Sequence, residues 1–172
     1  MNKIRQRMNI PLSDVENIDD IKIPPSNISE KLEIILKEDV PLLSIGMGNP
    51  GRIVSQAHNS GTKEMTMVTT VDEALSVAKV EVDIIAVQGA EAGGHRSTFE
   101  VRSTSEIPLA GTMALVPQVA DALSHNNFKN MPIVASGGIT DGRGLIAAFC
   151  LGVSGILEGT RFLMAEESNC QN

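Results

Sequence analysis

The sequence is poor in aromatic residues, with no tryptophan, no tyrosine and only 4 phenylalanines. Proteins that bind single-stranded nucleic acids commonly stack the bases on aromatic side chains, so this scarcity argues against such a surface. The 2 cysteines, Cys150 and Cys170, are too few for the disulfide framework of a small secreted domain. No apolar run approaches the roughly 18 residues that indicate a membrane-spanning helix, which argues against a membrane protein.

Charge and composition narrow the class of protein further. The 14 basic and 21 acidic residues give a net charge of −7, which argues against non-specific binding to nucleic acid. The opening residues, MNKIRQRMNI, are basic but lack the apolar region of a secretory signal. Together with the cysteine count, these features predict a cytoplasmic protein. The length of 172 residues and the 42% hydrophobic content predict about one globular domain.

Short apolar segments alternate along the chain with segments of helical pattern. Residues 1–26 are polar and irregular and are expected to form an N-terminal arm, whereas residues 27–172 form the folded domain. Continuous apolar runs are typical of parallel strands that are covered by helices. The sequence therefore predicts an α/β fold with about five parallel strands, in the segments VPLLSIGMG, EMTMVT, VDIIAVQG, MPIVASGG and VSGILEGT.

Capping and breaking residues predict where several helices begin. Thr70 and Glu73 match the capping-box pattern at the start of one helix. Pro117 suits the first turn of another, and Thr140 is expected to cap the helix after the fourth strand. The segment TRFL, after the last strand, is predicted to be a turn.

Three glycine clusters each follow directly after an expected strand: QGAEAGG, SGG and EGT. Taken singly, each is more often a tight turn, but ligands of parallel α/β folds bind at the carboxyl ends of strands, where all three fall. Glycine lets the backbone approach a ligand and offer N–H groups to an anion. We predict a phosphate site formed by Gly137 and Gly138 in one loop and by Gly159 and Thr160 in another. None of the clusters matches a dinucleotide fingerprint or a P-loop.

The best candidate for catalytic chemistry is His95, which follows Gly93 and Gly94 in the loop after an expected strand. Imidazole titrates near neutral pH and can act as a base or a hydrogen-bond donor; the alternative is a solvent-exposed loop histidine. Gln88, at the end of that strand, either binds the edge of a flat polar heterocycle or holds the following loop. No histidines and carboxylates have the spacing of metal ligands, so no metal is predicted.

Three separated motifs occur in order along the chain: QGAEAGGHRSTF, LAGTMALVPQVADAL and MPIVASGGITDGRGLIAAFCLGVSGILEGTRFL. Together they resemble the nitronate monooxygenase family, formerly called 2-nitropropane dioxygenases, over about residues 40–168. The family is an FMN-binding TIM barrel, so the resemblance implies a partial (β/α)8 barrel that holds the C-terminal strands. It also implies oxidation of an alkyl nitronate, such as propionate 3-nitronate, by molecular oxygen to a carbonyl compound and nitrite.

The resemblance assigns roles to individual residues. His95 is implied to be the active-site histidine beside the flavin N5 edge, and Gln88 and Gly93 to contact the flavin ring region. The ribityl phosphate of FMN is assigned to Gly138, Leu157, Glu158, Gly159 and Thr160, in agreement with the phosphate site expected from the glycine loops. The implied partners are a small nitronate and molecular oxygen, without nucleic acid or membrane; a homodimer stays open.

The sequence departs from the family in several respects, and the segment SIGMGNP also lacks the aromatic residue that the family usually has before this glycine turn. The family usually has glutamine where Glu158 stands, and a carboxylate there repels a phosphate unless it is paired or turned away. The family's opening barrel strands and its C-terminal part have no counterpart, and a complete barrel takes about 250 residues. We therefore expect a gene fragment truncated at both ends, in which residues 27–172 are an incomplete FMN-binding TIM-barrel domain with weak or no activity alone.

Two other functions stay open from the sequence. A flavin-dependent enoyl-acyl-carrier-protein reductase shares the barrel and a similar QGxEAGGH motif, and uses NAD(P)H as its electron donor. The chain could also persist as an inactive fragment or as a binding module without catalysis.

Overall fold

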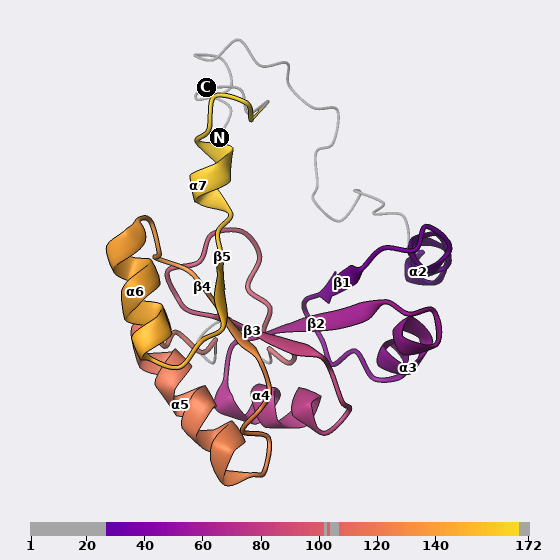
Figure 1. The fold of residues 1–172 in the computed structure, drawn as a ribbon, viewed down its shortest axis with the longest axis horizontal. Helices are drawn as coiled ribbons and strands as arrows, with labels where there is room; N and C mark the ends of the chain where they lie inside the picture. Colours follow the sequence, from indigo (N-terminus) through magenta and orange to yellow (C-terminus); the bar gives the residue numbers. More distant parts are fainter. Residues whose placement is uncertain (1–26, 102, 104–106, 169–172) are drawn as a thin grey trace. The chain divides into compact units, whose positions relative to one another are not determined.

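A computed structural model describes residues 27–101, 103 and 107–168 of the chain, and the predicted arm at residues 1–26 lies outside them. Residues from Ile34 onward form one compact unit, which holds every described strand. Helices and strands alternate (Figure 1) in the order α2 (Ile28–Lys37), β1 (Leu42–Ile45), α3 (Arg52–Asn59), β2 (Lys63–Val68), α4 (Val71–Ala78), β3 (Ile84–Gln88), α5 (Thr112–His125), β4 (Ile133–Ser136), α6 (Gly142–Cys150), β5 (Gly155–Leu157) and α7 (Thr160–Leu163).

The described strands form a single parallel sheet in the order β1-β2-β3-β4-β5, so that neighbours in sequence are also neighbours in the sheet. The register aligns Gln88 with Ser136 and Ser136 with Leu157. The carboxyl ends of β3, β4 and β5 therefore meet at one edge of the sheet. The prediction of about five parallel strands in a partial α/β barrel is confirmed.

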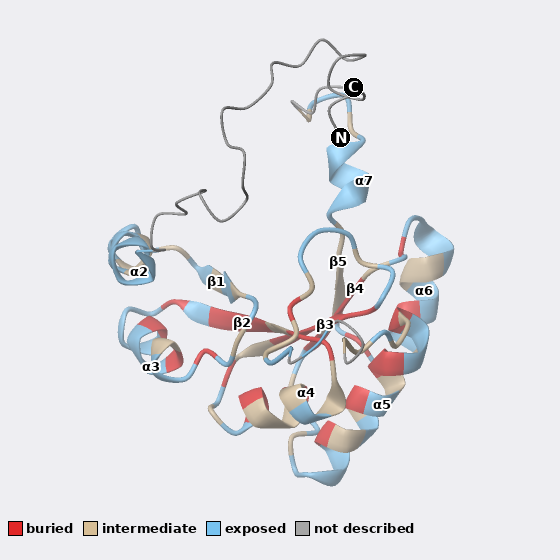
Figure 2. Cartoon of the chain, turned by 180° about the vertical axis from the view of Figure 1, so that it is seen from behind, coloured by how far each residue is buried: buried red, intermediate tan, exposed pale blue. Residues whose placement is uncertain are grey.

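The hydrophobic core lies between the sheet and the helices that connect its strands. Val87 and Ala135 point to this side, where they are fully buried among residues of α4 and α5 such as Val77 and Val119. Figure 2 shows buried residues on β2, β3 and β4 and on parts of α3, α4 and α5, whereas β1 and β5 carry none. Because side chains alternate along a strand, Gln88 and Ser136 point to the opposite side of the sheet.

Helix α5 begins earlier than the sequence predicted. It starts at Thr112, so Pro117 lies inside the helix and not in its first turn. The start is fixed by a contact that is distant in sequence, since the Thr112 amide donates a 2.9 Å hydrogen bond to the Glu91 carboxylate. That hydrogen bond satisfies a donor that a helix N-terminus otherwise leaves free, and it outweighs the local preference of proline for a first turn.

Of the two other predicted helix caps, the structure confirms one and corrects the other. Thr70 caps α4 as predicted, since its hydroxyl accepts a 3.1 Å hydrogen bond from the Glu73 amide. The prediction that Thr140 caps α6 was wrong: the cap is Asp141, whose carboxylate accepts a 2.9 Å hydrogen bond from the Arg143 amide. Aspartate is the stronger cap of the two neighbouring candidates. The segment TRFL, predicted as a turn, is the short helix α7.

Among the described residues, no helix is both long enough and apolar enough to cross a membrane.

Candidate functional site

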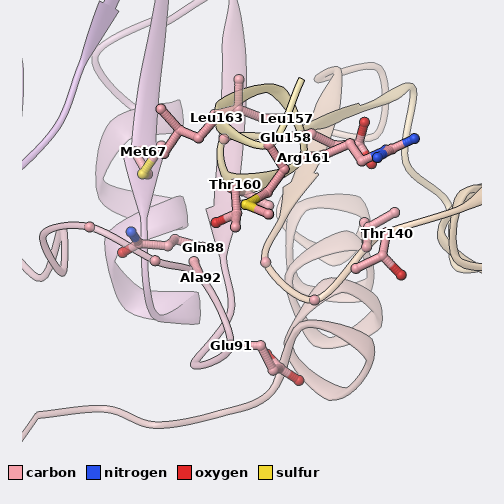
Figure 3. Close-up of a pocket in the computed structure, with 18 residues that line it drawn as sticks. Met67, Gln88, Glu91, Ala92, Thr140, Leu157, Glu158, Thr160, Arg161 and Leu163 are labelled. Carbon is pink, nitrogen blue, oxygen red and sulfur yellow. The ribbon is translucent and has the colours of Figure 1, made fainter. Parts of the chain in front are cut away.

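A cavity of about 690 Å³ lies at the carboxyl ends of β3, β4 and β5 (Figure 3). Its walls are the loops that follow these strands, together with Met67 of β2 and residues of α7. All the residues that were predicted to bind the cofactor line this cavity: Gln88, Gly93, Gly137, Gly138, Leu157, Glu158, Gly159 and Thr160. The fold thus brings together three segments that are far apart in the sequence.

His95, the predicted catalytic residue, is placed differently. It is exposed and does not line the cavity, although the preceding residue, Gly94, does. Its main-chain carbonyl accepts a 2.9 Å hydrogen bond from the Gln88 side chain. The imidazole is therefore carried by a loop that is tied to the end of β3, at the rim of the cavity.

The loop after β4 owes its path to two glycines with backbone conformations that other residues rarely adopt. Gly137 has φ of 111° and Gly138 has φ of 69°. A Cβ atom on Gly137 would lie 2.7 Å from the Ala92 amide nitrogen, so the loops after β3 and β4 touch through their backbones. Glycine at position 137 is thus required both by its dihedral angles and by this close approach.

The loop after β5 closes a third side of the cavity. A Cβ atom on Gly93 would lie 3.4 Å from the Thr160 hydroxyl, which places the loops after β3 and β5 next to each other. Apart from its chain neighbours, no atom of the described residues lies within 4 Å of the Cβ position of Gly159, so its backbone faces open space. The arrangement leaves room for a ligand to approach the backbone of Gly159 and the side chain of Thr160.

The sequence left open whether Gln88 binds a flat heterocycle or holds the loop that follows β3. In the structure, its side-chain amide already has hydrogen-bond partners in that loop. The side chain is 4% exposed, and its Nε2 atom donates to the His95 carbonyl at 2.9 Å. Its Oε1 atom accepts a 2.9 Å hydrogen bond from the Ser97 amide. Gln88 therefore holds the following loop in place while it lines the cavity.

Glu91 lines the cavity and has a structural role, and Figure 3 shows its side chain apart from the other labelled ones. One carboxylate oxygen accepts hydrogen bonds from the Thr112 amide at 2.9 Å and from the Thr112 hydroxyl at 3.1 Å. Burial raises the pKa of Glu91, but the hydrogen bonds from Thr112 and from the Glu91 amide, together with the Arg96 charge, outweigh it, so the pKa lies below its ordinary value. A carboxylate that accepts such bonds is held in its charged form.

Arg96 belongs to the same loop as His95, and it was not among the residues predicted from the sequence. Its guanidinium donates to the main-chain carbonyls of Gln88, Gly89 and Pro108. The motif AGGHR contains this residue, but nothing in the spacing indicates that its side chain folds back onto the strand that precedes it.

A separate group of ionisable side chains lies at the end of α3, on β2 and just before β3, and none of them lines the cavity. Glu64 is fully buried; its Oε1 accepts a 2.7 Å hydrogen bond from the Thr66 hydroxyl, and its Oε2 has no partner among the described residues. Asp83 lies 2.7 Å from Lys63 Nζ and 2.8 Å from His58 Nε2. Burial raises the pKa of Glu64 to about 7; the Asp83 charge adds to this, while Thr66 and His58 oppose it.

Among the described residues, no group of three or more histidine, cysteine, aspartate or glutamate side chains is arranged to hold a metal ion.

Comparisons with known proteins agree with the resemblance carried by the motifs. A family model described as nitronate monooxygenase matches residues 6–172, which extends the resemblance to both sides of residues 40–168. A probable nitronate monooxygenase of Staphylococcus aureus (strain Newman) is 39% identical over 139 residues, which are 80% of this chain and 37% of that protein.

Two solved structures are similar to the chain. Nitroalkane oxidase from Streptomyces ansochromogenes has a TM-score of 0.79 and 29% identity, covering 98% of this chain and 46% of that one. FabK from Thermotoga maritima has a TM-score of 0.72 and 31% identity, covering 87% of this chain and 42% of that one. The chain thus spans less than half the length of each of these relatives.

Proposed function

The chain belongs to the nitronate monooxygenase family, and from this premise we propose that it binds FMN in the cavity at the carboxyl ends of β3, β4 and β5. We propose further that the bound cofactor serves the oxidation of alkyl nitronates by molecular oxygen, which yields a carbonyl compound and nitrite. The observation that carries the proposal is the assembly around one cavity of the residues expected to bind the cofactor.

The size and position of the cavity suit such a ligand. Its volume of about 690 Å³ falls within the range of about 300–1,000 Å³ that small-molecule and cofactor sites occupy. Its position, at the carboxyl ends of parallel strands, is where ligands bind in α/β folds. The absence of side chains at Gly93 and Gly159 keeps space free between the loops after β3 and β5.

The two glycine loops are the part of the cavity suited to the phosphate of FMN. Gly137 and Gly138 hold a positive-φ turn whose backbone N–H groups can face an anion, as in other nests of main-chain amides. On the other side, the open backbone of Gly159 and the hydroxyl of Thr160 can supply further donors. Glu158 also lines the cavity and carries the wrong charge for a phosphate, so its carboxylate must turn away from that group.

FMN supplies the redox chemistry when bound, while the residues of this chain bind it, orient it and handle protons. Gln88 fixes the loop that carries Gly93 and His95, so that the loop keeps a constant shape against the cavity. His95, when neutral, can remove the α-proton of a nitroalkane and so generate the nitronate. When protonated, it can donate a hydrogen bond to a nitro oxygen.

The proposed cofactor is tested by titrating the purified full chain with FMN and following flavin fluorescence and visible absorption. We expect a bound, yellow flavin, and nitrite release from propionate 3-nitronate in air. Riboflavin lacks the phosphate, so its affinity is expected to be at least about tenfold lower if the glycine loops bind that group through charge-assisted hydrogen bonds.

Two results would contradict the proposal, the second of them from a parallel assay with NADH and an enoyl thioester. A chain that stays colourless at saturating FMN defeats cofactor binding altogether. A chain that binds FMN and oxidises NADH in the presence of an enoyl thioester, with no nitrite from nitronates, favours the enoyl reductase instead.

Replacing His95 with alanine separates its role as a base from a role in binding. If His95 removes the α-proton, kcat/KM for a neutral nitroalkane is expected to fall by at least about 10²-fold. The nitronate has already lost that proton, so its oxidation is expected to fall far less. Steady-state nitrite release with both substrates measures the two effects.

His125, an exposed histidine at the end of α5, provides the matched control, and His125→Ala is expected to leave both substrates unaffected. If His95→Ala loses the same activity on the nitroalkane as on the nitronate, His95 is not the base that removes the α-proton. If activity on both substrates is unchanged, His95 has no part in the mechanism.

A further inference from the structure

Arg96 joins the two ends of the loop that runs from β3 to α5. Its Nη1 atom donates to the carbonyls of Gln88, at 2.9 Å, and Gly89, at 2.7 Å, where β3 ends. Its Nη2 atom donates to the carbonyl of Pro108 at 2.8 Å, shortly before α5 begins. One guanidinium group therefore closes the base of this loop.

The surroundings of Arg96 indicate that this arrangement has a cost. The side chain is half-buried, and its Nε atom is buried without a hydrogen-bond partner among the described residues. Burial lowers the pKa of Arg96, while the negative charges of Glu73 and Glu91 oppose that effect. A buried donor without a partner costs free energy, which the hydrogen bonds that the guanidinium does make must offset.

What those contacts stabilise is the wall of the cavity. The same loop is tied by Gln88, which bonds His95 and Ser97, and by a 2.9 Å hydrogen bond from the Ala90 amide to the Ala110 carbonyl. Cavity-lining residues 91–94 lie between these ties. The Arg96 side chain links the start of the loop directly to its far end at Pro108.

We propose that Arg96 is a positioning residue for the cofactor site: by binding carbonyls at both ends of the loop, it holds residues 91–94 in the shape that contacts the flavin. The proposal rests on the proposed function, because it assigns Arg96 to the same FMN cavity. Arg96 itself does not line the cavity, so it acts through the loop and not by touching the ligand.

Lysine cannot replace arginine in this role. The guanidinium presents two nitrogen atoms in a rigid planar fork that reaches carbonyls on both sides, whereas a lysine ammonium is a single point donor. The Arg96→Lys variant keeps the positive charge but loses the planar pair of donor nitrogens. The Arg96→Ala variant loses both the charge and the donors. Arg143→Ala is the matched control, because Arg143 is exposed on α6 and its guanidinium pairs with the neighbouring Asp141, away from the loop.

The test uses the full chain and two measurements. Hydrogen exchange without FMN reports on the amides of Ala90 and Ser97, which the loop ties protect, and exchange at Leu115 in α5 serves as the internal reference. FMN titration reports affinity, and the visible circular dichroism of bound flavin reports the shape of its surroundings.

In Arg96→Ala and Arg96→Lys we expect faster exchange at Ala90 and Ser97 but not at Leu115. We expect FMN affinity to fall about ten- to a hundredfold in both variants, since charge-assisted hydrogen bonds are lost. We also expect an altered flavin dichroism. Millimolar guanidinium ion should restore affinity to Arg96→Ala but not to Arg96→Lys, whose side chain still fills the site.

Several outcomes overturn the proposal. If the amides of Ala90 and Ser97 exchange in both variants at the same rate as in the wild type, Arg96 does not hold the loop. Faster exchange with unchanged FMN affinity shows that the loop does not shape the site. If Arg96→Ala fails to fold, Arg96→Lys decides by the same criteria. If the wild-type chain binds no FMN, the proposed function fails with it, while the exchange data still show separately whether Arg96 closes the loop.

Discussion

Replacing Gly89 with alanine is expected to destabilise the protein by about 4 kcal/mol or more, at the upper end of what single substitutions do. Gly89 is buried directly after β3, and its amide continues the ladder by donating to the Ser136 carbonyl at 2.9 Å. A Cβ atom there would overlap the hydroxyl and the amide nitrogen of Thr112 and would lie 2.6 Å from its Cα atom. Backbone atoms at the start of α5 cannot move aside as a flexible side chain can, so β3 and α5 would have to separate.

Chemical denaturation followed by circular dichroism measures the effect. Gly142→Ala is the matched control, because Gly142 is the first residue of α6 and, outside its own helix and chain neighbours, no atom in the described part of the chain lies within 4 Å of its Cβ position. That change is expected to alter the free energy of unfolding by less than about 1 kcal/mol. A Gly89→Ala variant as stable as the control would show that the contact between β3 and α5 is not tight.

The second large effect is a dependence of stability on pH that comes from Glu64. The pKa of this buried carboxyl is about 7 in the folded protein, against an ordinary value of 4.5. Between these values the unfolded chain has released its proton while the folded chain keeps it. The free energy of unfolding therefore falls as the pH rises from 4.5 to 7, and becomes insensitive to Glu64 above pH 7.

Glu64→Gln removes this titration and keeps the shape of the side chain and an oxygen that can accept from Thr66. Relative to wild type, the variant is expected to gain about 2 to 3 kcal/mol of stability between about pH 5 and pH 8. Urea unfolding curves at both pH values measure the gain. The same substitution at exposed Glu38 provides the control and is expected to show no comparable gain. An equal difference between variant and wild type at both pH values would mean that Glu64 is charged in the folded state throughout.

The sheet and the lining of the cavity could be predicted from the sequence because both leave local signals. Strands such as β3 and β4 are continuous apolar runs, since one side packs on helices and the other faces the inside of a barrel. Gly137 and Gly138 directly follow such a run, and this position in the sequence is enough to place them at a strand end. Parallel strands carry their ends to one edge, so neighbouring loops had to meet there.

The features that could not be predicted depend on contacts between residues far apart in sequence. The start of α5 is set by Glu91 across the loop, and this contact overrode the signal of Pro117. Glu64 reads as an ordinary polar residue near the start of a strand, and only the packing of its surroundings makes it fully buried. Likewise, the partners of Arg96 are main-chain carbonyls, which exist at every residue and therefore leave no trace in the pattern of side chains.

The strand order has a consequence for how the molecule is made. Each described strand pairs only with the strands next to it along the chain, so the sheet can grow in the direction of synthesis without waiting for a late partner. The cavity differs, because it needs the loops after β3, β4 and β5 together. It is therefore complete only once β5 has docked on β4. A ligand of the cavity would then stabilise the sheet with β5 in place by mass action and would have nothing to bind on a sheet that still lacks β5.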